Sequence, residues 1–244
     1  MDNQMIFLSL LVLHVIGDYY LQTDGMSKRK RGNARYTLRH SLIYGIPFLL
    51  LFIMYRNAAL IAATAVLVHG LIDQIKCLVE RKRDQGIFRW ATLRNSYLTD
   101  QLLHILSLFV MAYYMRTAAE LRFFSVEASL TAVKWILSAL LILKPVNITF
   151  KMLFSRFSPK EDKPLSIHGA GAVIGSLERV LMLIFLVLGQ YASIGLIMTA
   201  KSIERYDKIS KDPVFAEYYL IGTLFSILMT LLVYLVVIGI PISI

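Results

Sequence analysis

Cysteine and charge are both scarce in this chain. Cys77 is the one cysteine among 244 residues, which excludes a framework of intramolecular disulfides. Charged residues make up 17% of the sequence, whereas 57% is hydrophobic, and the mean hydropathy is +0.62. Because a soluble domain carries roughly a quarter of its residues as charges, this balance predicts a protein whose solvent is a lipid bilayer.

Long apolar runs make up much of the sequence. A helix needs about 20 predominantly apolar residues to cross the hydrocarbon of a bilayer. Seven stretches approach this length: 5–21, 38–55, 58–79, 97–115, 126–148, 174–191 and 216–240. An eighth, 192–208, begins apolar and ends in charged residues, which is typical of a short or half-inserted helix. We therefore predict an all-α fold, a polytopic transmembrane helical bundle with about 7–8 spans.

The first apolar run differs from a removable signal peptide. Its flank, residues 1–5, carries an aspartate but neither lysine nor arginine, and no small-residue cleavage site follows the run. We expect it to remain as a helix. We also expect a single membrane domain over 1–244, with four spans in 1–125, the other spans in 126–244, and a cytoplasmic connection near 149–173.

The net charge of +10 is concentrated in a few segments. Twenty of the 26 lysines and arginines lie in four of them: 22–39, 76–94, 149–173 and 201–212. With eight crossings these segments share one side of the membrane, and the positive-inside rule places them in the cytoplasm and both termini outside. Anionic lipid headgroups are a sufficient partner for this charge. We predict contact with membrane lipids and no nucleic-acid binding, and the sequence leaves the oligomeric state open.

Three histidines in apolar runs each have an aspartate four residues away. The pairs are His14 with Asp18, His69 with Asp73, and His104 with Asp100. Residues four apart lie on one face of a helix, and His40 adds a fourth imidazole just inside another apolar run. At about 1.5 Å of rise per residue, all seven groups fall in the cytoplasmic half of the membrane. Ionisable groups at such depth are costly, which makes them candidates for function.

The donor set is typical of a transition-metal site. Four imidazoles and three carboxylates exceed the needs of one tetrahedral ion, so we predict one or two divalent ions, zinc or manganese. A pair of ions orients a phosphate-like group and lowers the pKa of bound water. Asp18, Asp73 and Asp100 are the candidate catalytic residues, since one of them can stay free as a general base.

The same His/Asp pairs are compatible with three further roles. A single pair is more readily explained by interhelical hydrogen bonds, which contribute about 0.6–2 kcal/mol apiece in membranes. A transporter or channel for protons, metal ions or a small anion would use the cluster as a relay or transit site. The outer halves of the first four spans offer little polar character beyond Asn3, Ser9 and Thr64, which favours a dead-end site. The third role is that of a non-catalytic scaffold whose basic loops recruit a soluble partner.

Five further residues are candidates for substrate binding: Gln22, Arg39, Arg179, Lys201 and Arg205. The last three could form an anion-recognition patch beside the metals, because arginine presents a planar fork suited to phosphate. The alternative is a network of ion pairs that fixes helix register, Glu178 with Lys201 or Arg205, and Arg179 with Glu217. The fifth histidine, His168, is expected to be solvated.

Several segments resemble an uncharacterised bacterial family of integral membrane proteins, the domain of unknown function 3307. They are His14-Val-Ile-Gly-Asp18-Tyr-Tyr-Leu-Gln22, His69-Gly-Leu-Ile-Asp73, Asp100-Gln-Leu-Leu-His104, Gly175-Ser-Leu-Glu178-Arg179, Ala200-Lys201-Ser202 and Glu217-Tyr-Tyr-Leu-Ile-Gly222-Thr223. The resemblance runs over nearly the whole chain. It implies a protein of the bacterial inner (plasma) membrane and supplies no activity.

A weaker similarity, through the two His-x-x-x-Asp elements, links the chain to membrane-bound metal-dependent hydrolases and zinc-dependent phospholipase C. It implies hydrolase chemistry with His40 and His104 as further ligands, although this chain has no evident counterpart of the phospholipase's terminal-amine ligand. The leading hypothesis is a membrane-embedded metal-dependent hydrolase that acts on a phosphoester or related bond of an amphiphilic, lipid-like substrate from the cytoplasmic leaflet.

Overall fold

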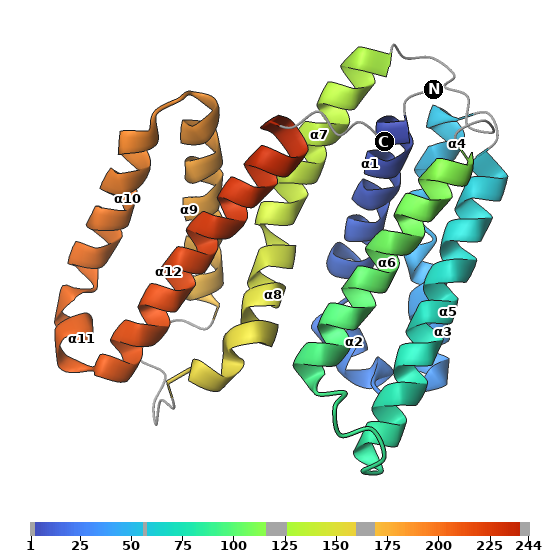
Figure 1. The fold of residues 1–244 in the computed structure, drawn as a ribbon, viewed down its shortest axis with the longest axis horizontal. Helices are drawn as coiled ribbons and strands as arrows, with labels where there is room; N and C mark the ends of the chain where they lie inside the picture. Colours follow the sequence, from blue (N-terminus) through green and yellow to red (C-terminus); the bar gives the residue numbers. More distant parts are fainter. Residues whose placement is uncertain (1–2, 56–57, 116–125, 160–168, 240–244) are drawn as a thin grey trace. The chain divides into compact units, whose positions relative to one another are not determined.

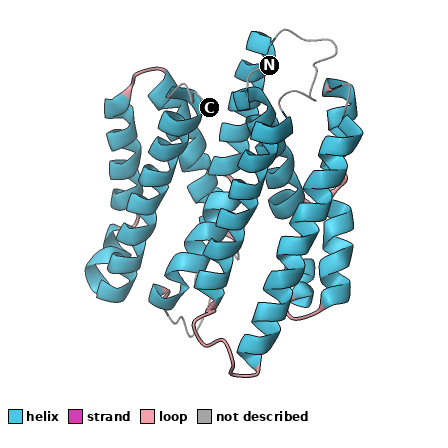
Figure 2. Ribbon diagram, turned by 45° about the vertical axis from the view of Figure 1, so that its right-hand side comes forward, coloured by secondary structure: helices cyan, strands magenta, loops and turns pink. Residues whose placement is uncertain are grey.

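The chain folds into helices. A computed structural model describes residues 3–55, 58–115, 126–159 and 169–239, and within these ranges it contains helices and loops but no β-strand (Figure 2). The prediction of an all-α fold is confirmed. The described helices group into two compact units, one formed by the described residues up to Leu137 and the other by those from Ser138 onwards.

The first unit is built mainly from four packed helical segments. Its elements are α1 (Asn3–Val15), the π-helical turn η1 (Ile16–Tyr20), α2 (Asp24–Lys30), α3 (Ala34–Tyr44), the 3₁₀ turn η2 (Pro47–Leu50), α4 (Leu51–Met54), α5 (Ala58–Asp84), α6 (Leu93–Met115) and the greater part of α7 (Val126–Ile142). Helix α6 packs against both α1 and α5, and α3 also packs against α5 (Figure 1).

The chain reverses sharply between α1 and α3. Helix α2 leaves the direction of α1 by 88°, and two polar caps fix the turns that flank it. The Thr23 hydroxyl accepts a hydrogen bond from the Met26 amide, and the Asn33 side chain accepts from the first amides of α3. Gly17 allows η1 to approach α3, because a Cβ there would lie 2.6 Å from the Tyr44 ring.

An apolar core fills the part of the first unit that lies towards the N-terminus of α1. On α1 it begins one residue before His14, with Leu13, and continues to Leu10 and Ile6. The other contributors are Tyr44, Phe48, Leu51, Tyr55, Ala58, Ile61, Ala65, Leu108, Met111 and Ala112. On α5 these residues all precede His69, and on α6 they all follow His104. The polar side chains of the helices are thereby gathered at the opposite end of the core.

The second unit contains the end of α7, α8 (Lys144–Phe154), the 3₁₀ turn η3 (Ser155–Phe157), α9 (Ala170–Val187), α10 (Tyr191–Glu204), α11 (Tyr206–Lys211), α12 (Pro213–Val233) and the π-helical turn η4 (Tyr234–Gly239). Helices α8 and α10 each pack against α9, and α12 contacts α8, α9 and α11. Asp212 caps α12 by accepting from the Phe215 amide, with Pro213 in the first turn.

Several helices are long and apolar enough to cross a membrane, which indicates a membrane protein. Five segments qualify: Ala34–Met54, Ala58–Asp84, Leu130–Phe157, Ala170–Val187 and Pro213–Gly239. The bent pair Gln4–Tyr20 and Asp24–Lys30 makes a sixth if it counts as one span. The finer count of 7–8 is not confirmed.

Two predicted spans account for the difference. The stretch 97–115 lies on α6, whose apolar run is interrupted by Asp100, Gln101 and His104. The stretch 192–208 corresponds to α10, whose 14 residues reach about 21 Å, short of the roughly 30 Å of hydrocarbon. The division into a four-span half and a second half within one membrane domain stays a prediction.

Candidate metal centre

All seven predicted metal ligands meet inside the first unit. None of them exposes more than 7% of its surface. They come from four helical segments: His14 from α1, Asp18 from η1, His40 from α3, His69 and Asp73 from α5, and Asp100 and His104 from α6. The four-residue spacing places each His/Asp pair on the inward face of its helix. The π-helical turn at Asp18 is a local geometry that recurs at functional sites.

The imidazole rings are in direct contact, with His69 in the middle. Its ring centroid lies 4.3 Å from that of His104, 5.4 Å from His40 and 5.9 Å from His14. The Tyr44 ring stacks on its other face, with centroids 3.5 Å apart and planes inclined by 3°. Four helical segments therefore place their histidines within one small volume, where a single ion can be reached from several directions.

Each carboxylate reaches an imidazole on a different helical segment or one turn away. Asp73 lies at the centre, with Oδ2 3.6 Å from Nε2 of both His40 and His69 and Oδ1 3.8 Å from Nε2 of His104. Asp18 Oδ1 lies 3.1 Å from His40 Nε2, and Asp100 Oδ1 lies 3.4 Å from His104 Nε2. Most of these distances are longer than a good hydrogen bond.

Many of the buried donor atoms lack a hydrogen-bond partner among the described residues. They are Nε2 of His14, Nδ1 of His40, both ring nitrogens of His69, Oδ1 of Asp100 and Nε2 of His104. A buried polar atom without a partner is costly, so native proteins leave few of them. A bound cation would satisfy several at once, and the residues present therefore fit a metal ion.

The donor atoms form three overlapping groups that could each hold an ion. These are His14, His69 and His104; Asp18, His40 and His69; and Asp73, Asp100 and His104, each with its ligand atoms within 4.8 Å of one another. Ligands at about 2.0–2.1 Å from a tetrahedral ion stand about 3.3 Å apart. A shortening of at most about 1.5 Å between the ligand atoms would close any of the three groups around an ion.

Two lysines also enter the cluster, and the sequence patterns did not reveal either of them. Lys30 Nζ lies 3.1 Å from Asp73 Oδ2 and 3.9 Å from Asp18 Oδ1, and Lys76 Nζ lies 2.8 Å from Asp100 Oδ2. In the sequence both belong to the basic segments. Lys76 follows Asp73 by three residues, so a shared helix face could have revealed it. Lys30 reaches Asp73 only because α2 bends away from α1, and no linear pattern marks that turn.

Hydrogen bonds from neighbouring side chains orient the cluster. Gln101 donates to Asp18 Oδ2 at 3.0 Å and to Asp100 Oδ2 at 3.2 Å, and it accepts from the Tyr19 hydroxyl at 2.9 Å. The Tyr44 hydroxyl lies 3.3 Å from Nδ1 of His14. A partner on one ring nitrogen fixes the ring orientation and leaves the other nitrogen for an ion.

The five predicted substrate-binding residues are not all brought together. Arg39 lies on the exposed face of α3, and Gln22 lies in the half-buried turn after η1. Arg179, Lys201 and Arg205 belong to the second unit, where they line one cavity, so their expected place beside the metals stays a prediction. His168 lies outside the described residues.

The sequence also predicted ion pairs among these residues, as the alternative to an anion-recognition patch. One predicted pair forms and another does not. Glu178 and Lys201 do pair, with Oε2 and Nζ 2.7 Å apart. The pair of Arg179 with Glu217 is wrong, because the guanidinium turns instead to neutral acceptors on α7, α8, α9 and α12. Glu217 lies on an outer face of α12.

The fold and the cluster define an all-helical protein with several membrane-length helices and a buried His/Asp site. The family model described as "Protein of unknown function (DUF3307)" matches residues 6–131, just over half of the chain, and the chain belongs to this family. The matched residues fall within the first unit and include all seven predicted ligands. The match covers less of the chain than the resemblance predicted, because the segments between 175 and 223 lie outside it. No curated protein and no solved structure matches the chain.

Proposed function

We propose that this protein is a metal-dependent hydrolase of the bacterial inner membrane. It binds a divalent transition metal ion, zinc or manganese, in the first unit. It cleaves a phosphoester or related bond of an amphiphilic, lipid-like substrate that enters from the cytoplasmic leaflet. When bound, such an ion polarises a phosphoryl oxygen and lowers the pKa of its water. The remaining chemistry falls to the side chains of the cluster.

One observation carries the proposal. His14, His69 and His104 come from three different helices, and each has a buried Nε2 without a hydrogen-bond partner among the described residues. Catalytic zinc sites use three protein ligands of this kind and keep a fourth position open for water or substrate. We assign Asp73 as the general base because its carboxylate faces three imidazoles. Asp18, His40 and Asp100, the other predicted ligands, belong to the two neighbouring groups of donor atoms and lie beside this site.

The charges of the cluster favour one ion over two. Three aspartates contribute three negative charges, and the ammonium groups of Lys30 and Lys76 balance two of them. One divalent ion leaves a net charge of about +1 with neutral imidazoles, whereas a second leaves about +3 in a buried, weakly screened site. Two ions would reach the same net charge of about +1 only if both lysines left the cluster.

The apolar core supports a dead-end site over a transport path. A transporter needs polar groups on both sides of its central site. Beyond the cluster, however, Leu10, Ile61 and Leu108 lie fully or nearly buried and belong to one packed apolar core. The hydrogen bond between Ser9 and Tyr55 is a local polar contact within that region. The cluster is accessible from the end opposite this core. There Lys30 and Lys76 expose 11% and 19% of their side chains.

The accessible end of the cluster determines the orientation that we propose for the protein in the membrane. The side of Lys30 and Lys76 faces the cytoplasm, where Arg39, Gln22 and the basic loops contact anionic headgroups. We count α6 as a further crossing, since its 23 residues extend about 34 Å. We count α10 as a short eighth crossing. With eight crossings both termini lie outside.

Metal content of the purified full chain tests the proposal. Elemental mass spectrometry of the protein in detergent is expected to find about one zinc or manganese per chain, and His69→Ala is expected to lose it. His168→Ala is the matched control, and its metal content is expected to equal that of the parent protein. Hydrolysis of a phospholipid probe should disappear with a chelator and return with metal. A parent protein that carries no metal and takes none up would overturn the proposal.

A further inference from the structure

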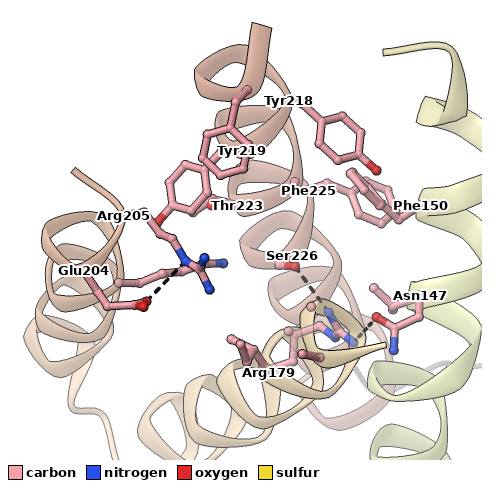
Figure 3. A pocket seen from close by; sticks show the side chains of 18 of the residues that line it. Asn147, Phe150, Arg179, Glu204, Arg205, Tyr218, Tyr219, Thr223, Phe225 and Ser226 are labelled. Atoms are coloured by element: carbon pink, nitrogen blue, oxygen red, sulfur yellow. Dashed lines mark hydrogen bonds and ion pairs between the residues drawn. The ribbon is translucent and has the colours of Figure 1, made fainter. Parts of the chain in front are cut away.

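A cavity of about 510 Å³ lies within the second unit, between α8, α9, α12 and the end of α10 (Figure 3). Its volume falls in the range of small-molecule sites, about 300–1,000 Å³. All of its lining residues belong to the second unit. None of the seven cluster residues lines the cavity.

Arg179 places a buried cation at one side of this cavity. The residue exposes 2% of its surface. Its guanidinium donates to the Asn147 side chain at 2.8 Å, to the Ser226 hydroxyl at 3.3 Å, to the Ser176 hydroxyl and to two backbone carbonyls at the end of α7 (Figure 3). All of these acceptors are neutral, and no carboxylate of the described residues lies within ion-pair distance of it. The adjacent Glu178 attracts the guanidinium through space but forms its ion pair with Lys201, so the buried cation itself contacts only dipoles. Such a cation is costly, which points to an anion supplied from outside the chain.

The rest of the cavity adds to the positive charge. Lys201, Arg205 and Lys208 also line it, together with one glutamate, Glu204. Glu178 pairs with Lys201, and Glu204 lies 3.3 Å from Arg205 Nε. Among the described residues of the lining, Arg179, Lys201 and Arg205 therefore outnumber the one carboxylate, that of Glu204. The excess of positive charge favours a ligand with more than one negative charge.

An unused hydroxyl lies beside these cations. Thr223 exposes 8% of its surface, lines the cavity, and its Oγ1 has no hydrogen-bond partner among the described residues. It lies on α12 one turn before Ser226, which already binds Arg179 (Figure 3). Since buried hydroxyls are normally satisfied, this one is placed to donate to a ligand oxygen.

An apolar wall faces the polar groups. The ring centroid of Phe150 lies 5.5 Å from that of Tyr218 and 5.6 Å from that of Phe225, so the three rings form one aromatic surface (Figure 3). Gly175 leaves room for the Arg179 guanidinium, because a Cβ there would lie 3.2 Å from its Nη1. A ligand that fills the cavity therefore carries an anionic group and an apolar portion.

We infer that this cavity binds the phosphate monoester headgroup of an amphiphile, with Arg179, Arg205 and Thr223 on the phosphate and the aromatic wall on the apolar chain. A phosphate presents several acceptor oxygens and about two negative charges, which matches the guanidinium fork of Arg205, the positive charge of Arg179 and the hydroxyl donor of Thr223. A carboxylate would leave part of this donor set unused. The inference does not rest on the proposed hydrolase activity, since it involves only the second unit.

Native mass spectrometry of the full chain in detergent tests the inference, with phosphatidic acid, phosphatidylcholine and inorganic phosphate as separate probes. We expect phosphatidic acid to bind at least about tenfold more tightly than phosphatidylcholine. Arg179→Gln is expected to weaken phosphatidic acid binding by about tenfold or more, and Thr223→Val by about threefold or more. Inorganic phosphate should compete only at much higher concentration, because it lacks the apolar contacts. If inorganic phosphate binds as tightly as the lipid, the amphiphile is the wrong ligand.

Two controls keep the result interpretable. Arg156→Gln removes an exposed arginine of the same unit that does not line the cavity, and it should leave binding within about twofold of the parent. Arg205→Gln removes a half-exposed cation of the cavity and replaces the Arg179 variant if that variant unfolds. Equal binding by the parent, Arg205→Gln and Thr223→Val would overturn the inference. Metal content, measured in the same samples, is expected to be unchanged in every variant.

Discussion

The ammonium of Lys30 on α2 lies 3.1 Å from the carboxylate of Asp73 on α5, 43 residues further along the chain. This contact places a positive charge at the edge of four closely packed imidazoles. It also gives Asp73 a counter-ion in the absence of a metal. A lysine in this position repels a metal ion bound nearby. Removal of Lys30 therefore tests the stability of the metal-free cluster and the affinity of the cluster for metal as two separate quantities.

Replacement of Lys30 by methionine is expected to destabilise the metal-free protein. Breaking a buried ion pair from one side costs about 3–5 kcal/mol, and less where one partner is partly exposed. Added zinc should restore more stability to Lys30→Met than to the parent, because it replaces the missing cation. Thermal unfolding with and without zinc measures both effects. Lys28→Met, a position on the same helix outside the cluster, serves as the control, and an equal response of the two variants would contradict the expectation.

Replacement of Asp73 by asparagine should abolish hydrolysis while the protein still binds metal. A general base contributes about 10²–10⁴-fold to the rate, and asparagine keeps the size of the side chain. Turnover of a phospholipid probe and metal content are measured on the same sample. Asp24→Asn, on the exposed first turn of α2, should retain full activity. An active Asp73→Asn enzyme would exclude this residue as the base.

Loss of the Tyr44 hydroxyl should weaken metal binding without unfolding the cluster. In Tyr44→Phe the ring remains stacked on His69, but His14 Nδ1 loses its partner at 3.3 Å. Partners of this kind typically account for about 10–100-fold in metal affinity. Competition with a zinc indicator measures the change. Tyr55→Phe removes a buried hydroxyl bonded to Ser9 and should leave the affinity unaltered; a similar loss in both variants would point to general loosening instead.

A methyl group at residue 17 should disturb both the fold and the site. The Cβ of Gly17→Ala would lie 2.6 Å from the Tyr44 ring, so η1 and α3 must separate, at a cost of about 1–3 kcal/mol. The same separation pulls Asp18 away from His40. Gly25→Ala is the control, because nothing lies within 4 Å of its added Cβ, and its unfolding temperature should not fall. Thermal unfolding curves of the two variants test this expectation. Equal curves would show that the close approach of η1 to α3 does not contribute to stability.

Much of the candidate site follows from local sequence patterns. Helix periodicity places His69 and Asp73 on one face, and the reversed order of Asp100 and His104 suits a helix that runs the other way. Hydropathy locates most of the membrane-length helices because it depends on runs of neighbouring residues alone. Prediction from hydropathy is less secure for two helices. In α6 the cluster residues lower the mean hydropathy of the helix, and in α10 the apolar run is shorter than the hydrocarbon of a bilayer.

By itself, the sequence determined that the protein is helical, rich in membrane-length apolar segments and provided with seven ionisable side chains at matching positions. Only the tertiary structure decided which cations accompany those side chains, and that the second group of basic residues surrounds a cavity. Lys30 meets Asp73, and Arg179 turns to Asn147 and Ser226 rather than to Glu217, through contacts between residues far apart in the chain. Periodicity and hydropathy act over a few turns, whereas the partner of a buried charge depends on how whole helices pack.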